Sequence, residues 1–123
     1  MTITEAIARV NALIPNKYTN EDKVRWLNEI DGVINTEIFD RYEKDETLPT
    51  YEPYTAADLT KTLLAPEPYS VLYVYYLQSK INYADNETDR YNNSSAMFNE
   101  CYKNFGNWYN RTHKAFQPKV KYW

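Results

Sequence analysis

Residues 66–84 read PEPYSVLYVYYLQSKINYA, and this stretch decides the fold. Proline suits the first turn of a helix, so its two prolines predict a helix that begins at residue 66 and runs to 84. Apolar side chains recur at helical spacing on one face (Tyr69, Leu72, Tyr73, Tyr76, Leu77 and Ala84), with Val71, Val74, Tyr75 and Ile81 on the other side. Residues 71–76 also have the composition of a strand, but the helical spacing continues beyond them and favours a helix. A helix that is apolar nearly all round is either central in its own domain or covered by a neighbouring chain.

A second long helix is predicted directly afterwards, over residues 86–111, with a length of about 40 Å at 1.5 Å per residue. Its apolar stripe consists of Tyr91, Phe98, Tyr102, Phe105 and Tyr109, with Met97, Cys101 and Trp108 beside it. Asn104, Gly106 and Asn107 are weak helix formers, so we expect the last turns to kink or fray.

Two further helices are predicted before this pair. The first covers residues 3–14, because Thr2 and Glu5 have the spacing of a capping box. The second covers residues 20–40, with Thr19 or Asn20 as its cap. Its apolar side chains form one stripe, which consists of Val24, Leu27, Ile30, Ile34 and Ile38.

Residues 43–65 show no lasting period, contain Pro49 and Pro53, and begin with a cluster of acidic side chains. They predict a long acidic loop, and a short helix over 56–64 stays open as an alternative. Loops of this length in a small domain are usually functional or disordered. The fold class that follows is all-α, with about four helices in one small domain over residues 1–113, a loop insertion at 43–65 and an extended basic tail over 114–123.

The composition fits one domain of 123 residues but contains an unusual number of aromatic side chains: 13 Tyr, 4 Phe and 3 Trp. A core of this size holds only some of them. Tyrosine is enriched where protein surfaces meet, so the remainder suit contacts with other chains, although they also suit the edge of the core. The net charge of −3 disfavours binding to nucleic acid, and no signal peptide or membrane-length apolar run is present, so we expect no membrane partner.

The residues that carry catalysis or bind metals are scarce. His113 is the only histidine and falls near the expected fraying end of a helix, so no catalytic triad can be completed around it. Cys101 lies beside an apolar stripe and suits an inert thiol. The spacing of Asp85, Glu87 and Asp89 resembles the start of a calcium loop, but the later glycine and glutamate are absent, so capping of the following helix explains them better. We therefore expect no enzyme, no cofactor and no metal.

Several linked segments resemble one family of proteins from tailed phages and prophages. They are residues 4–7 (TEAI), 16–18 (NKY), 23–27 (KVRWL), 29–32 (EIDG), 66–69 (PEPY), 72–77 (LYVYYL), 90–94 (RYNNS) and 109–113 (YNRTH). The family is that of the head–tail connector proteins of siphophages, also called adaptor or head-completion proteins. The likeness covers most of the chain except the loop at 43–65, and it rests on these linked segments rather than on one diagnostic motif.

The resemblance implies a structural ring subunit of the phage neck, with about twelve copies in the ring. Such a ring joins the portal protein to a stopper or tail-completion protein, and DNA passes through it without sequence-specific binding. The implied location is the head–tail junction of the virion, after assembly in the bacterial cytoplasm. The candidate protein-contact residues are Tyr51, Tyr54, Tyr75, Trp108, Lys114, Phe116, Lys119, Lys121 and Trp123.

Three alternatives remain open. The chain fits another neck component, such as the stopper or tail-completion protein itself. Residues 3–40 also have the outline of a helix-turn-helix, as in a small DNA-binding regulator, but the second helix carries Glu21, Asp22, Glu29 and Asp31 where bases would need basic or amide side chains. An enzyme of unknown type is the weakest alternative.

Overall fold

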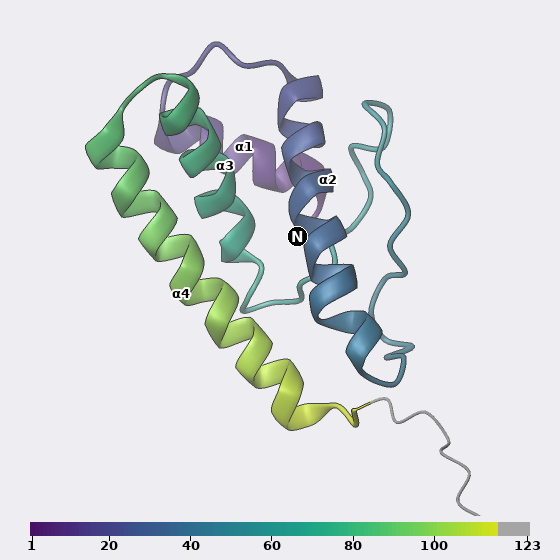
Figure 1. The fold of residues 1–123 in the computed structure, drawn as a ribbon. Helices are drawn as coiled ribbons and strands as arrows, with labels where there is room; N and C mark the ends of the chain where they lie inside the picture. The colour runs from purple at the N-terminus through teal and green to yellow at the C-terminus, as the bar shows by residue number, and fades with distance from the viewer. Residues whose placement is uncertain (116–123) are drawn as a thin grey trace, which may run out of the picture.

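The computed structural model describes residues 1–115, and within them the fold is built from helices. They are α1 (Ile3–Leu13), α2 (Asn20–Glu37), the 3-10 helix η1 (Phe39–Arg41), α3 (Val71–Ala84) and α4 (Thr88–Thr112). Figure 1 shows α4 along one side of the molecule and the long segment between η1 and α3 along the opposite side, beyond α2. The prediction of an all-α fold with four helices is confirmed.

The starts of α1 and α2 are determined by local sequence. The Thr2 hydroxyl accepts a hydrogen bond from the Glu5 amide, and the Glu5 carboxylate accepts one from the Thr2 amide, each at 3.2 Å. Thr19 and Asp22 form the same reciprocal pair at α2. Each box satisfies amides that the first turn of a helix leaves without partners. The predicted α1 is confirmed, whereas α2 ends at Glu37, before the predicted residue 40, where the chain tightens into η1.

Helix α3 is central in the fold. It packs against α4, α1 and α2, and four of its side chains (Leu72, Tyr73, Leu77 and Ile81) are completely buried. The apolar side chains on nearly every side of α3 are therefore covered largely by other parts of the same chain. The predicted start at residue 66 is wrong, because α3 begins only at Val71 after a turn in which the Tyr69 amide donates to the Pro66 carbonyl. The helical conformation is disfavoured for Glu67 because it precedes Pro68.

Helix α4 has 25 residues and continues through Gly106 to Thr112, so the expected fraying does not occur. Phe105 and Tyr109 are buried on either side of this weak stretch and hold it against the rest of the protein. Phe98 and Tyr102, earlier in the stripe, are only half-buried. The stripe thus anchors α4 most firmly near its end.

The segment before α3 contributes to the core rather than extending from it. The alternative of a short helix over 56–64 is wrong, since this part forms turns and single hydrogen bonds. Leu63, Leu64 and Ala65 are buried, and the Leu63 amide donates to the Met1 carbonyl at 2.9 Å. The Ile3 amide donates to the Lys61 carbonyl at 3.0 Å. The segment is thereby joined to the start of α1.

A buried carboxylate joins the same segment to α2 and α3. Asp31 is completely buried, and it accepts hydrogen bonds from the hydroxyls of Tyr54 (2.6 Å) and Tyr73 (2.5 Å) and from the Leu64 amide (3.2 Å). The Tyr73 hydroxyl in turn accepts one from the Ala65 amide at 2.7 Å. Burial raises the pKa of Asp31 to about 6, although the three donors oppose that rise. Asp31 is therefore the polar centre around which the loop is ordered.

Candidate functional site

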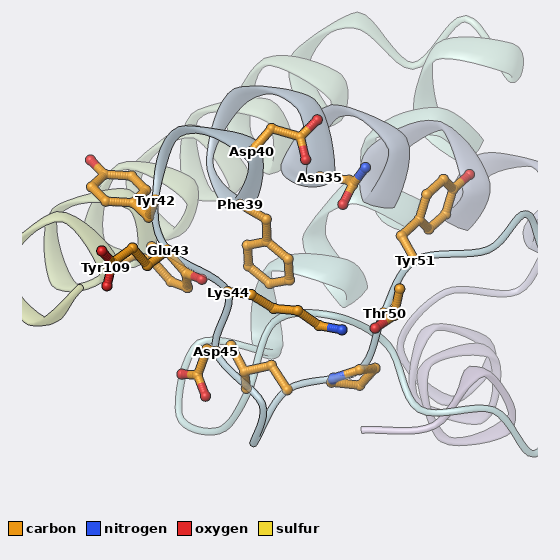
Figure 2. Close-up of a pocket in the computed structure, with 12 residues that line it drawn as sticks. Asn35, Phe39, Asp40, Tyr42, Glu43, Lys44, Asp45, Thr50, Tyr51 and Tyr109 are labelled. Atoms are coloured by element: carbon orange, nitrogen blue, oxygen red, sulfur yellow. The ribbon is translucent and has the colours of Figure 1, made fainter. Parts of the chain in front are cut away.

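A hollow of about 400 Å³ lies between the end of α2, η1 and residues 42–51, and we call it the loop groove. Figure 2 shows Phe39 at its centre, Lys44 lying across it and Thr50 and Tyr51 on the far side. Its acidic lining residues are Asp40, Glu43 and Asp45. The groove therefore combines an aromatic floor with a mainly acidic rim.

The floor of the loop groove is fixed by α4. The Phe39 ring stacks on Tyr109 with ring centres 5.1 Å apart, and Tyr42 meets the same ring edge-on at 5.3 Å. The Tyr42 hydroxyl donates to the Asn110 side chain at 2.7 Å. Because Tyr109 is only 1% exposed, these contacts anchor the floor of the groove on α4.

His113 fastens one side of the groove. Its Nε2 lies 2.6 Å from a carboxylate oxygen of Asp45, and its ring stacks on Tyr109 with centres 3.6 Å apart. Hydrogen bonds from Thr47, followed by the contact with His113, lower the pKa of Asp45 to about 2. One member of the acidic cluster at residues 43–46, Asp45, is therefore bonded to the end of α4.

The surroundings of His113 also contain a hydroxyl, which invites comparison with a catalytic triad. Thr112 Oγ1 lies 2.9 Å from His113 Nδ1, but the same hydroxyl donates to the Trp108 carbonyl at 2.8 Å, within its own helix. The loop groove is lined by Asp45 but not by Thr112 or His113. The hydroxyl thus does not face the hollow that could hold a substrate, and the arrangement acts as a clasp between α4 and the loop.

A second hollow, of about 510 Å³, lies between the end of α1, the middle of α3 and the first half of α4. We call it the apolar groove, because Leu13, Tyr75 and Met97 line it and Leu13 and Met97 are 59% and 45% exposed. Polar side chains form the other half of its ten lining residues, which are Gln78, Asn82, Arg90, Asn93 and Ser94. Met97 precedes Tyr109 by twelve residues, about 18 Å along α4, so the two grooves occupy separate parts of the molecule.

Four of the predicted contact residues lie on grooves or at the surface, each in a different environment. Tyr51 lines the loop groove and Tyr75 the apolar groove, both half-buried. Trp108 is half-buried against Tyr69, with ring centres 5.1 Å apart. Lys114 is exposed, 3.9 Å from a carboxylate oxygen of Glu43.

Tyr54 is the exception among the described residues, because it is only 7% exposed and donates its hydroxyl to Asp31. Its side chain serves the core of its own chain and leaves little surface exposed. The remaining predicted contacts, Phe116, Lys119, Lys121 and Trp123, lie outside the described residues.

Sequence reasoning did not single out Leu13 and Met97 as exposed apolar side chains. Met97 lies beside the predicted stripe of residues 86–111, and Leu13 lies at the end of the helix predicted over residues 3–14. The acidic residues before α4 were expected to cap that helix, but the two that precede it do not. Asp85 accepts from the Tyr18 hydroxyl at 2.6 Å, and Glu87, at the cap position, forms no side-chain capping bond.

Comparison with known proteins found no matching family model, no matching curated protein and no matching solved structure. Within residues 1–115, no three or more His, Cys, Asp or Glu side chains are placed to hold a metal ion. None of the helices described combines the length and apolar character required to span a bilayer.

Proposed function

We propose that the protein is a structural subunit of a tailed-phage neck, an adaptor that forms a ring of about twelve copies against the portal protein. The ring joins the portal to a stopper or tail-completion protein, and DNA passes through its lumen. The linked sequence segments that resemble the connector family support this function. The physical support comes from the two grooves, which have different chemistry and lie in separate parts of one small chain.

The observation that carries the proposal is the apolar groove. Leu13 and Met97 expose about half of their surfaces, and they flank Tyr75 in one hollow. Apolar and aromatic side chains gathered in this way are typical of the buried centre of a protein interface. A ring is built from head-to-tail contacts, in which one patch meets a different patch on the next copy. A chain with two unlike surfaces meets that requirement.

The charge of the chain suits the proposed lumen. The protein carries 17 acidic and 14 basic side chains, so its net charge of −3 repels DNA weakly. A channel through which DNA slides must avoid the phosphate contacts that hold DNA-binding proteins in place. The acidic balance therefore supports a passive channel rather than a binding site for nucleic acid.

The alternative of a DNA-binding regulator loses support from the surroundings of α2. Asn28, on its polar side, accepts from the Tyr54 amide at 2.6 Å and donates to the Tyr54 carbonyl at 2.7 Å. A recognition helix needs its polar side chains free to reach base edges in the major groove. Here the loop engages Asn28, and the exposed charged side chains of α2 are the acidic Glu21, Glu29 and Glu37 with one basic residue, Arg25.

The test is assembly with the portal protein, viewed by negative-stain electron microscopy. We expect the wild-type protein to form a ring with the portal, and we expect Leu13→Glu with Met97→Glu to abolish it, because two carboxylates would be buried in the contact. Val33→Glu is the matched control, since Val33 is 41% exposed on α2, away from the apolar groove. Unaltered ring formation by the double variant, or failure of the wild type to join the portal–tail neck, would contradict the proposal.

A further inference from the structure

We propose that residues 116–123 of the chain bind in the loop groove of the same chain, as an intramolecular strap. The occupant carries lysine and aromatic side chains, and the groove offers an acidic rim and an aromatic floor. This inference changes one of the two surfaces that support the proposed function, because the loop groove would meet a neighbouring subunit with residues 116–123 bound in it.

The residues just before 116–123 lie at the edge of the groove. The Glu43 amide donates to the Lys114 carbonyl at 2.8 Å, and Ala115 pairs with Tyr42 in an antiparallel bridge. Tyr42 and Glu43 both line the loop groove. The last described residue, Ala115, therefore lies beside the groove, next in sequence to residues 116–123. Eight residues reach up to about 27 Å, which is ample for a hollow of about 400 Å³.

The charges of the two segments are opposite. Residues 37–52 contain six acidic and two basic side chains, whereas residues 116–123 contain Lys119 and Lys121 and no acidic side chain. Lys44 lies across the groove but is exposed and 3.9 Å from Glu46, so it can swing aside at little cost. An attraction between charges is weakly screened within about 8 Å at physiological salt, so it favours a segment bound in the groove.

The apolar parts of the two segments also match. The floor offers aromatic and apolar groups from Phe39, Tyr42, Leu48, Pro49, Tyr51 and Tyr109. Residues 116–123 supply Phe116, Val120, Tyr122 and Trp123. Because the segment is tethered at the rim, its effective concentration is in the millimolar range, so even weak affinity fills the groove. The tether is also the reason that this chain's own segment outcompetes that of a second copy.

Disulfide trapping in the full chain tests the proposal. In a Cys101→Ser background, Thr50→Cys is combined with Val120→Cys, because Thr50 lines the groove and is exposed. The matched control combines Arg111→Cys with Val120→Cys, because Arg111 is exposed and near the start of the segment but does not line the groove. Disulfides form only when the two Cα atoms approach to about 4.4–6.8 Å.

We expect the groove pair to form an intramolecular disulfide at least tenfold faster than the control pair, as measured on non-reducing gels and by mass spectrometry. Adding Lys119→Glu and Lys121→Glu removes this advantage, and circular dichroism confirms that all variants stay folded. Equal rates for the two pairs would overturn the proposal. Disulfide-linked dimers would also overturn it, since they would assign the groove to the segment of a second copy. Ring assembly is tested at Leu13 and Met97, so the two failures are distinguishable.

Discussion

Helix α3 packs against α4 and the loop packs against α2 by different means. Between α3 and α4 the contact is mainly apolar, with Leu77 and Phe105 completely buried and Tyr76 packed on Phe98. Between α2 and the loop the contact depends on hydrogen bonds, which converge on Asn28 and Asp31. One contact is spread over many side chains, and the other is concentrated on two.

The difference determines how each contact fails. Apolar packing loses stability in proportion to the volume that is removed, and its neighbours relax partly into the space. A buried carboxylate with several donors is far less tolerant, because removing it leaves every donor without a partner. One substitution should therefore be enough to detach the loop from α2. The packing of α3 against α4 should persist after a single substitution.

The largest effect is expected from Asp31→Ala. It leaves the Tyr54 and Tyr73 hydroxyls and the Leu64 amide without their acceptor, so we expect a loss of about 3–5 kcal/mol in the free energy of unfolding. Urea unfolding at pH 7 measures the loss. The exposed Asp40→Ala is the control, with an expected change within about 0.5 kcal/mol. Equal effects of the two substitutions would refute the central role of Asp31.

Leu77→Ala tests the apolar contact on the other side of α3. The side chain is completely buried, so we expect a loss of about 3 kcal/mol through the cavity left behind. Hydrogen exchange separates this variant from the previous one. In Leu77→Ala, protection should fall throughout the helices, whereas in Asp31→Ala it should fall first at the Tyr54 and Leu64 amides. The same pattern in both variants would contradict the distinction between the two contacts.

The raised pKa of Asp31 predicts a dependence on pH. The folded-state pKa is about 6 against an ordinary value of 3.8, so the folded protein holds this proton more tightly than the unfolded chain. The resulting stabilisation is fully present below pH 4 and is lost as the pH rises through 6. At about 1.4 kcal/mol per pKa unit, the loss amounts to about 2–3 kcal/mol. Asp31→Asn lacks this titration. The stability of the wild type relative to Asp31→Asn should therefore fall between pH 4 and 7, and a constant difference would disprove the shift.

The smallest effect is expected from Asp45→Asn, at the clasp between the loop and α4. The pKa of Asp45 is lowered to about 2, so its stabilisation is present above pH 3.8 and is lost as the pH falls through 2. Because the pair is near the surface, we expect a loss of only about 1 kcal/mol at pH 7. The Glu43 amide, bonded to Lys114, should exchange faster in the variant. Unchanged exchange there would mean that the clasp does not hold the bridge.

The helices were predictable because their signals are local. The capping boxes at Thr2 and Thr19 lie within four residues of the groups that they satisfy, and the apolar period of α4 extends over several turns. The start of α3 was missed because the prolines were interpreted as a first turn, although they form a separate turn before it. Of the candidate contact residues, Tyr51 and Tyr75 are half-buried on grooves and Tyr54 is buried, and their sequence neighbours do not distinguish these positions.

By itself, the sequence determined the number, order and approximate limits of the helices, because those features depend on neighbours a few residues apart. Only the tertiary structure decided that the loop is ordered around Asp31, that His113 meets Asp45, and that Leu13 and Met97 share one groove. Each of these depends on residues more than twenty positions apart in the chain. Such contacts form only after the helices have packed, and no local period or cap encodes which side chains will then meet.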